Sequence, residues 1–235
     1  MLCLDAGNTV IFLDHARLAA ETTALGHLVL HEKLVVAEGE AKHLSETSAL
    51  LDFSWAGKEN PGASSWGRAV GTMLARAGVH EAALPDLVPW LWKSHVEYNF
   101  WSAVPDGLGE ALDAFRETGG KVAIVSNSEG MLAQLFARLG IGKHFDVVAD
   151  SGLLGVEKPD PRIFHYVLEH VGKPKERALH LGDIFATDVL GARAAGIRHA
   201  LIDPFRHYEG HHADVPRVGG VPEVARALAR ARTPN

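Results

Sequence analysis

Short apolar runs alternate with segments of helical period along most of this chain. Five runs rich in Val, Ile, Leu and Ala fit buried strands, and the segments between them repeat apolar residues every three to four positions, as in Leu108, Leu112 and Phe115. Parallel strands need a long crossover, which is usually a helix, so this alternation predicts an α/β fold with a parallel sheet covered by helices. The expected strands are 2–5, 122–125, 146–149, 178–181 and 199–202, with a last helix near 221–232.

The stretch 14–101 interrupts this alternation. It contains helical spacings such as Leu18, Thr22 and Leu25, and no convincing strand, so it is predicted to be a helical insert with a turn at 60–65. An insert placed directly after the first strand is expected to act as a lid over the carboxyl edge of the sheet. The expected division is a core of 1–13 and 102–235 and a cap of 14–101. The aromatic residues expected either to pack the core of this cap or to line its pocket are Trp90, Trp92, Tyr98, Phe100 and Trp101.

Composition excludes several classes of partner. The 235 residues carry a formal net charge of −6 and no long basic run, which argues against nucleic acid or an anionic membrane as the main partner. No apolar run is long enough to span a membrane, and no export signal opens the chain. The single cysteine, Cys3, rules out an intrachain disulfide. These features predict a cytoplasmic protein, and they leave its oligomeric state undetermined.

Polar side chains gather where the predicted strands end. Asp5 closes the first strand, Ser126 and Asn127 follow the second, and Lys158 precedes a helix after the third. The fourth strand runs into Gly182–Asp188, which holds the carboxylates of Asp183 and Asp188. Because open α/β folds bind ligands at the carboxyl ends of their strands, these residues are expected to share one crevice. The hydroxyl and amide suit an anion, the ammonium suits a phosphoryl oxygen, and the carboxylates suit Mg²⁺.

This order of strand-end motifs resembles the haloacid dehalogenase superfamily of hydrolases. Four segments match the family's four motifs, and the resemblance covers nearly the whole core. The insert is similar to the helical cap of the branch that includes phosphoglycolate phosphatases, haloacid dehalogenases and phosphonatases. The resemblance therefore implies a Rossmann-like core with an inserted helical cap. The matching segments are Asp5-Ala6-Gly7-Asn8-Thr9, Ser126-Asn127, Lys158-Pro159, and Gly182-Asp183 with Asp188.

The resemblance implies a phosphatase that acts on a small phosphorylated metabolite. In such enzymes a carboxylate matching Asp5 attacks phosphorus and forms an aspartyl-phosphate that water hydrolyses. Lys158 would neutralise charge, and Ser126 and Asn127 would bind the phosphoryl group. The cofactor would be Mg²⁺. Its ligands would be Asp5, the backbone carbonyl of Gly7 and Asp183, with Asp188 as a further ligand or as a partner of the ligands.

Gly7 departs from the family pattern. Family phosphatases carry at this position an aspartate that protonates the leaving group and then activates water. Glycine keeps the carbonyl and removes the acid, a loss that typically costs about 10²- to 10⁴-fold in rate. The substitution favours a substrate with a good leaving group or a borrowed acid. The candidate acids are Asp14, His15, His27, His43 and His95.

Three alternatives remain open. The family's 2-haloacid dehalogenases and phosphonatases also lack the second aspartate, although the dehalogenases do not retain the Gly-Asp pattern followed by a second acid. A phosphonatase needs a cap lysine, for which Lys33, Lys42, Lys58 and Lys93 are candidates. A non-catalytic binding protein with the same fold is the second alternative. The third is a zinc site in the histidine-rich stretch 205–214, although such a stretch is more often a polar loop.

Overall fold

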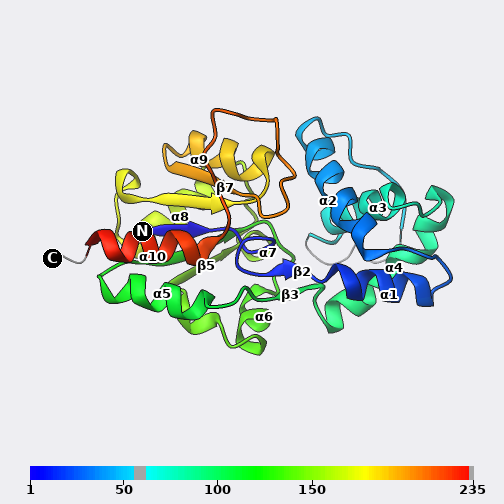
Figure 1. Ribbon diagram of the computed structural model, residues 1–235, viewed down its shortest axis with the longest axis horizontal. Coiled ribbons are helices and arrows are strands. Elements are labelled where there is room, and N and C mark those ends of the chain that lie inside the picture. The colour runs from blue at the N-terminus through cyan, green and yellow to red at the C-terminus, as the bar shows by residue number, and fades with distance from the viewer. Residues whose placement is uncertain (56–61, 233–235) are drawn as a thin grey trace. The chain divides into compact units, whose positions relative to one another are not determined.

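The computed structural model describes residues 1–55 and 62–232. It divides into two compact units, one formed by Met1–Phe12 with Ala103–Asn235 and the other by Leu13–Ser102 (Figure 1). Each unit has its own set of helices and its own apolar core. Within the described residues, no helix has both the length and the apolar character needed to cross a membrane.

The first unit is built on a six-stranded sheet in the order β5-β4-β1-β6-β7-β8, and every neighbouring pair is parallel. The prediction of an α/β fold with a parallel sheet is therefore confirmed. Strand β1 lies in the middle, where Leu2 pairs with Val122 on one side and with Leu179 on the other. The strands are β1 (Leu2–Leu4), β4 (Val122–Ser126), β5 (Val147–Asp150), β6 (Leu179–Gly182), β7 (Arg198–Ile202) and β8 (Arg217–Val218).

Three strands lie outside those expected from the sequence. The short β8 adds a sixth strand to the sheet, and β2 (Phe12–Leu13) pairs with β3 (Trp101–Ala103) in a separate two-stranded sheet. The expectation of no strand in 14–101 is thus wrong at its last residue, Trp101. Segments of two or three residues are too short to show a period of two, so their pairing depends on neighbours that are distant in sequence.

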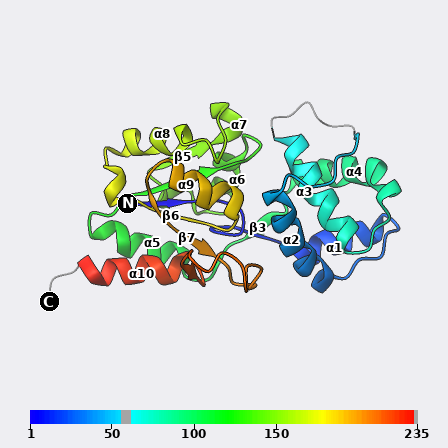
Figure 2. The same cartoon turned by 90° about the horizontal axis from the view of Figure 1, so that it is seen from above.

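Helices cover both faces of the six-stranded sheet. On one face, α8 and α9 pack on alternate strand residues that include Cys3, Ala123 and Val125. Side chains alternate across a strand, so Leu2 and Leu4 point to the opposite face. Helices α5 and α10 lie side by side in the same unit (Figure 2). The helices of this unit are α5 (Leu108–Glu117), α6 (Leu132–Arg138), α7 (Ser151–Leu154), α8 (Arg162–Val171), α9 (Leu190–Ala194) and α10 (Val221–Arg232), with a π-helical turn at Phe185–Val189 and short 3₁₀ turns at Gly142–His144 and Lys175–Arg177.

Local signals fix where several of these helices begin and end. Helix α8 ends at Gly172, whose positive φ of 63° closes the helix and is easiest for glycine. Helix α7 begins after Asp150, whose side chain accepts a hydrogen bond from the Gly152 backbone N–H. These boundaries place the strand-to-helix turns, which carry the polar residues, at the carboxyl edge of the sheet.

The second unit is helical, as expected for the insert. Asp14 caps α1 by accepting from the Arg17 backbone N–H at 2.9 Å. Residues 60 and 61 of the predicted turn lie outside the described residues, and Gly62 adopts a φ of 75° just before α3. The helices of this unit are α1 (His15–Ala24), α2 (His31–Glu46), α3 (Ala63–Arg76) and α4 (Leu84–Glu97), with a 3₁₀ turn at Glu81–Ala83.

The five aromatic residues singled out in the insert differ in exposure. Trp92 and Phe100 are buried, Trp101 is half-buried, and Trp90 and Tyr98 are 61% and 69% exposed. Trp92 packs against Trp66 with ring centroids 5.0 Å apart. Packing within the insert's own core therefore accounts for the buried aromatic residues and not for the two exposed ones.

Candidate functional site

The first strand delivers Asp5 to the centre of the sheet's carboxyl edge. The Asp5 backbone N–H donates to the Leu181 carbonyl at 2.8 Å, so the residue still pairs with β6. The chain then turns tightly, because the backbone N–H groups of Thr9, Val10 and Ile11 all donate to the Ala6 carbonyl. The turn that contains Gly7 is thus closed by its own hydrogen bonds directly behind Asp5.

Asn8 lies in the same turn and links it to the fourth strand end. Its φ of 50° is in the left-handed region, which asparagine tolerates better than most residues. Its side-chain amide donates to Asp183 Oδ2 at 3.3 Å. Nothing in the sequence pattern pointed to this contact, since the two residues are 175 positions apart.

Lys158 connects two of the predicted carboxylates. Its ammonium lies 2.6 Å from Asp5 Oδ1 and 2.6 Å from Asp188 Oδ1, and the residue is only 3% exposed. A buried ammonium between two carboxylates gains strong charge-assisted hydrogen bonds and avoids the cost of an unpaired buried charge. The structure therefore brings together Asp5, Lys158 and Asp188, as the sequence predicted.

The side chain of Asn127 bonds to the backbone of Lys158. Asn127 Oδ1 accepts from the Lys158 backbone N–H at 2.7 Å, and Asn127 Nδ2 donates to the Lys158 carbonyl at 2.9 Å. This pair of bonds fixes the residue that carries the ammonium. Ser126, the last residue of β4, is buried beside the same strand end.

Asp188 lies in the π-helical turn after β6, and both of its oxygens are engaged. Oδ1 accepts from Lys158 at 2.6 Å and lies 2.9 Å from His180 Nε2, while Oδ2 accepts from the Ile184 backbone N–H at 2.9 Å. The carboxylate also packs against Gly182, where a Cβ would lie 2.2 Å from Asp188 Cγ. Glycine at position 182 therefore leaves the space that Asp188 occupies.

Three carboxylates can face one cation. Asp5, Asp183 and Asp188 are all buried, and each offers an oxygen within 4.8 Å of the others, which makes them the one such group found among residues 1–55 and 62–232. Hard oxygen donors of this kind fit Mg²⁺. Asp188 fits less well as a direct ligand, because its oxygens already accept three hydrogen bonds. Asp5 accepts from Lys158 at Oδ1, and each of its oxygens still has a lone pair to offer, so the donor set that best fits the ion is Asp5 and Asp183.

Burial and charge shift the ionisation of this group in opposite directions. Burial raises the pKa of Asp5 to about 6, against the lowering effect of Lys158, and the other two carboxylates add to the rise. Burial also opposes the charge on Asp188, but the adjacent Lys158 and His180 outweigh it and hold the pKa of Asp188 below its usual range. Burial would lower the pKa of Lys158, but Asp188 and Asp5 together raise it. The ammonium is thus held in its charged form.

Asp150 is a strand-end residue that was not among the predicted site residues. It closes β5 and accepts from Ser128 Oγ at 2.7 Å and from three backbone N–H groups, those of Gly130, Leu132 and Gly152. These bonds hold the loop that follows Ser126 and Asn127. An aspartate just before a short helix is a recognisable cap, and that was the available signal.

The candidate acids and the candidate lysines of the insert belong to the second unit. His15 lies 3.0 Å from Glu38, and Lys42 lies 3.9 Å from the same carboxylate. His43 lies 3.6 Å from Glu46, and His95 accepts from the Phe100 backbone N–H. Asp14 caps α1, His27 is partly buried, Lys33 and Lys93 are exposed, and Lys58 lies outside the described residues.

The histidine-rich stretch 205–214 shows no sign of a zinc site. His212 stacks on Phe185 with ring centroids 3.4 Å apart, and Asp214 pairs with Arg193 at 2.7 Å. Within the described part of the chain, no group of His, Cys, Asp and Glu other than the three carboxylates is arranged to hold a metal. The stretch is accordingly a polar loop that packs on other residues of the first unit.

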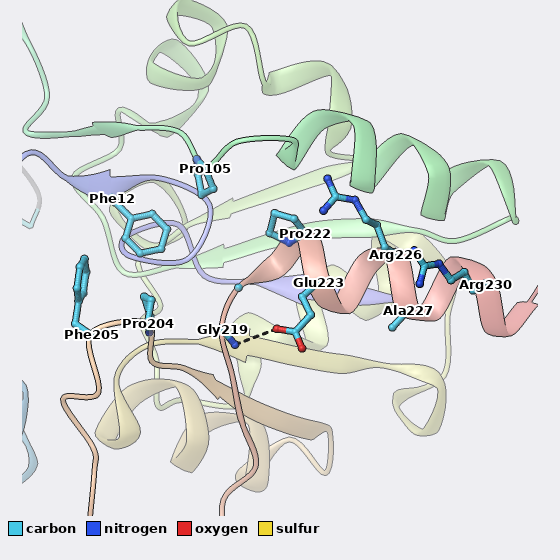
Figure 3. Close-up of a pocket in the computed structure, with 11 residues that line it drawn as sticks. Phe12, Pro105, Pro204, Phe205, Gly219, Pro222, Glu223, Arg226, Ala227 and Arg230 are labelled. Atoms are coloured by element: carbon cyan, nitrogen blue, oxygen red, sulfur yellow. Dashed lines mark hydrogen bonds between the residues drawn. The ribbon is translucent and has the colours of Figure 1, made fainter.

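A cavity of about 690 Å³ lies in the first unit beside α10 (Figure 3). Phe12, Pro105 and Phe205 line one end, and Arg226 and Arg230 project from successive turns of α10. None of the strand-end residues predicted to bind phosphate or metal lines it. The chemistry of the carboxylate group identifies the candidate site better than the size of this cavity does.

Comparison with known proteins identifies relatives of one kind. A model of the haloacid dehalogenase-like hydrolases matches residues 5–196. The haloacid dehalogenase-like hydrolase domain-containing protein 3 of Bos taurus is 34% identical over 128 residues, which cover 54% of this chain and 51% of that protein. The phosphoserine phosphatase of Thermus thermophilus is 29% identical over 189 residues, 76% of this chain and 74% of that enzyme.

The solved structures that match share the fold. The 2-haloacid dehalogenase of Pseudomonas syringae superposes with a TM-score of 0.57 at 18% identity and covers 98% of each chain. At that identity the likeness extends to the architecture alone. The chain spans about half the length of the domain-containing protein 3 relatives that it matches.

Proposed function

We propose that this chain, which belongs to the haloacid dehalogenase-like hydrolase family, is a Mg²⁺-dependent phosphatase acting on a small phosphorylated metabolite through an aspartyl-phosphate at Asp5. The observation that carries the proposal is Lys158, buried 2.6 Å from both Asp5 and Asp188. An ammonium at this position can neutralise the negative charge of the neighbouring carboxylates and that of a bound phosphoryl oxygen. The similarity to a phosphoserine phosphatase over 76% of the chain supports this reaction class.

In the first step an oxygen of Asp5 attacks phosphorus and forms a new P–O bond. The bond between phosphorus and the leaving group breaks, and its electron pair departs with the leaving group. Lys158 holds Asp5 Oδ1, which leaves Oδ2 to attack. Ser126 and the backbone N–H groups that follow it would bind the phosphoryl oxygens, while Asn127 keeps Lys158 in place through two hydrogen bonds.

In the second step the oxygen of a water molecule attacks phosphorus, and the bond between phosphorus and the Asp5 oxygen breaks. Its electron pair returns to the Asp5 carboxylate, and phosphate leaves while the protons of water pass to phosphate and solvent. Mg²⁺, held by Asp5, the Gly7 carbonyl and Asp183, would supply positive charge to the phosphoryl oxygens in both steps. Asn8 would orient Asp183 through its hydrogen bond to Oδ2. Asp188 would act through Lys158 rather than as a ligand.

Gly7 narrows the substrate class. A residue without a side chain cannot give a proton to the leaving group, and a positioned acid typically contributes about 10²- to 10⁴-fold. The leaving groups of acyl phosphates, aryl phosphates and phosphoanhydrides are weak bases, so they depart without receiving such a proton. We therefore assign the chain to substrates with good leaving groups, with the unit Leu13–Ser102 as the cap that selects among them.

A dehalogenase is the second candidate, because that reaction needs no proton donor at position 7. Asp183 and Asp188 favour the phosphatase, since a metal-independent reaction has no evident use for three buried carboxylates within 4.8 Å. A non-catalytic binding protein would likewise have no use for a nucleophile held by Lys158.

Phosphate release from acetyl phosphate and p-nitrophenyl phosphate, measured with and without Mg²⁺, tests the proposal. We expect turnover that requires Mg²⁺ and is lost in Asp5→Asn, while Asp86→Asn, at an exposed position in α4, behaves as the unmodified protein. Activity without metal, or full activity in Asp5→Asn, would overturn it. Chloride release from a 2-haloacid would establish the dehalogenase. Binding of phosphate without any turnover would establish the binding protein.

Restoring the missing acid tests the assignment of the substrate class. Gly7→Asp should raise turnover of an alkyl phosphate by about 10²-fold or more, and should raise aryl phosphate turnover far less. An equal gain on both substrates would contradict the role given to the leaving group. No gain on the alkyl phosphate would show that another acid already acts.

A further inference from the structure

We propose that His180 is a positioning residue of this site, because it donates hydrogen bonds to the Asp188 carboxylate and the Cys3 carbonyl and so fixes the carboxylate that holds Lys158 against Asp5. The inference deepens the proposed function and rests on it for the roles of Asp5 and Lys158. His180 lies in β6 and is fully buried at 0% exposure.

The contacts form one continuous chain. His180 Nδ1 lies 3.1 Å from the Cys3 carbonyl oxygen, and Nε2 lies 2.9 Å from Asp188 Oδ1. The same oxygen is 2.6 Å from Lys158 Nζ, which is 2.6 Å from Asp5 Oδ1. The chain of bonds therefore starts at the backbone of β1, two residues before the nucleophile, and returns to the nucleophile itself.

The chemistry of the ring explains why histidine suits this position. Both partners, a carbonyl and a carboxylate, only accept hydrogen bonds, so the ring satisfies both when each nitrogen bears a hydrogen. The edge contact with Phe164, with ring centroids 4.9 Å apart at 89°, limits rotation of the ring.

Among the described residues, Lys158 and His180 are the hydrogen-bond partners of Asp188 Oδ1. Its Oδ2 accepts from the Ile184 backbone N–H at 2.9 Å, and its carboxyl group fills the space above Gly182. Without a donor at His180 Nε2, Asp188 Oδ1 retains only the hydrogen bond from Lys158. The long side chain of Lys158 has many rotamers and so holds the carboxylate less firmly. The ammonium and the carboxylate can then shift together away from Asp5. The expected loss is in the chemical step, with little change in substrate binding.

Two substitutions separate the two ends of the ring. By bond count, the amide of His180→Gln reaches the place of Nε2 and retains a donor to Asp188, whereas the amide of His180→Asn reaches only the place of Nδ1 and retains the bond to Cys3. With p-nitrophenyl phosphate and Mg²⁺, we expect His180→Asn to lower kcat by about 10- to 100-fold, as loss of an orienting partner typically does. KM should change by less than about 3-fold, and His180→Gln should lose no more than about 5-fold in kcat.

A purely structural role predicts a different pattern. Both variants would then raise the unfolding equilibrium constant in urea to the same degree, and neither would change kcat of the folded protein. Equal loss of kcat in the two variants, or unchanged kcat in His180→Asn, would overturn the proposal. If His180→Asn does not fold, a loss above about 10-fold in folded His180→Gln overturns it as well.

A measurement without turnover separates this inference from the proposed function. If the unmodified protein releases no phosphate, the proposed function fails, and the unfolding constants of His180→Asn, Lys158→Met and the double variant decide the inference. Coupling through Asp188 predicts that the two single effects do not multiply, with a deviation of about 3-fold or more. Independent effects would show that His180 does not act on Lys158.

Discussion

Asp150 and Asp188 are both aspartates at the carboxyl edge of the same sheet, and both are 2% exposed. Asp150 accepts only from neutral donors, which are Ser128 Oγ and backbone N–H groups near it in the loop. Asp188 accepts from Lys158 and lies against His180. The difference lies in the donors, because neutral donors fix a loop, whereas cations hold a charge where chemistry can use it.

Close backbone packing accompanies both residues. A Cβ at Gly182 would collide with Asp188, and a Cβ at Gly152 would lie 2.5 Å from the Gly130 backbone nitrogen. Burial and a nearby glycine are thus common to a structural and a chemical aspartate. Neither feature identifies a functional carboxylate, but the chemistry of its hydrogen-bond partners does.

The largest expected difference between the two residues is in turnover. Asp188→Asn removes the anion that holds Lys158, so kcat for p-nitrophenyl phosphate should fall by roughly 10²- to 10³-fold, as for loss of one electrostatic stabiliser. Asp150→Asn should leave kcat of the folded protein within about 10-fold, since its partners only shape a loop. Circular dichroism establishes the folded fraction of each variant. Equal losses of kcat in the two variants would contradict the distinction between a chemical role for Asp188 and a structural role for Asp150.

The next difference is in stability. Asp150→Asn replaces an accepting oxygen by a donor in front of converging N–H groups, so the free energy of unfolding should fall by roughly 2 to 3 kcal/mol. Ser128→Ala removes a single donor to Asp150 Oδ1 and should cost about 1 kcal/mol. Urea unfolding of both variants measures these values. A cost for Asp150→Asn no greater than that for Ser128→Ala would show that the other bonds contribute little.

Magnesium should distinguish the two strand ends. The ion relieves repulsion among Asp5, Asp183 and Asp188, so at about 100 times its dissociation constant it should add up to about 2.7 kcal/mol to the free energy of unfolding. Asp183→Asn should reduce this gain sharply, whereas Ser128→Ala should retain it. Calorimetric titration with Mg²⁺ gives the affinities. A gain that is unchanged in Asp183→Asn would remove that residue from the metal site.

The smallest expected effect concerns the opposite end of β5. Asp146 accepts from Lys121 Nζ at 2.8 Å and from the Val122 backbone N–H at 2.9 Å. Partial burial raises the pKa of Asp146, but these donors outweigh it and hold that pKa below its usual value. A lowered pKa in the folded state adds stability above the unfolded pKa of about 3.9, and the addition is lost as pH falls through the folded pKa.

Asp146→Asn should therefore cost about 1 to 2 kcal/mol at pH values above about 5, and progressively less in more acidic solution. Urea unfolding of both proteins at a series of pH values measures the difference. A difference that stayed constant into acid would mean that the carboxylate's charge contributes nothing. Asp146 and Asp150 would then both stabilise the fold through the geometry of their hydrogen bonds, without a contribution from charge.

Local sequence patterns were enough to predict the sheet and the motif residues. The five expected strands agree with β1, β4, β5, β6 and β7 to within a residue or two, because a buried parallel strand is a continuous apolar run. Strand β8 has two residues, Arg217 and Val218, and a run that short carries no such signal. The prediction of Asp5, Lys158 and Asp188 as neighbours followed from their places at strand ends, and the structure brings them together.

The partners of these residues were not predictable in the same way. Asn127 was predicted to bind phosphoryl oxygens, and the sequence did not indicate that its amide also bonds the backbone of Lys158, 31 residues away. The sequence pattern indicated only that His180 belongs to an apolar strand. The pairing of β6 with β1 is what places its ring beside the Cys3 carbonyl and Asp188. Hydrogen bonds between distant segments depend on distances of a few tenths of an ångström, which packing sets and sequence spacing does not.

The sequence by itself determined that strand-end carboxylates and a lysine would meet at one edge of a parallel sheet, and that position 7 lacks an acid. Both follow from chain order and residue type, since parallel strands all end at the same edge and glycine has no side chain. Only the tertiary structure decided which aspartate faces cations and which closes a loop. That choice depends on side chains delivered from separate elements, because a buried polar group takes whichever donors the packed fold leaves within reach.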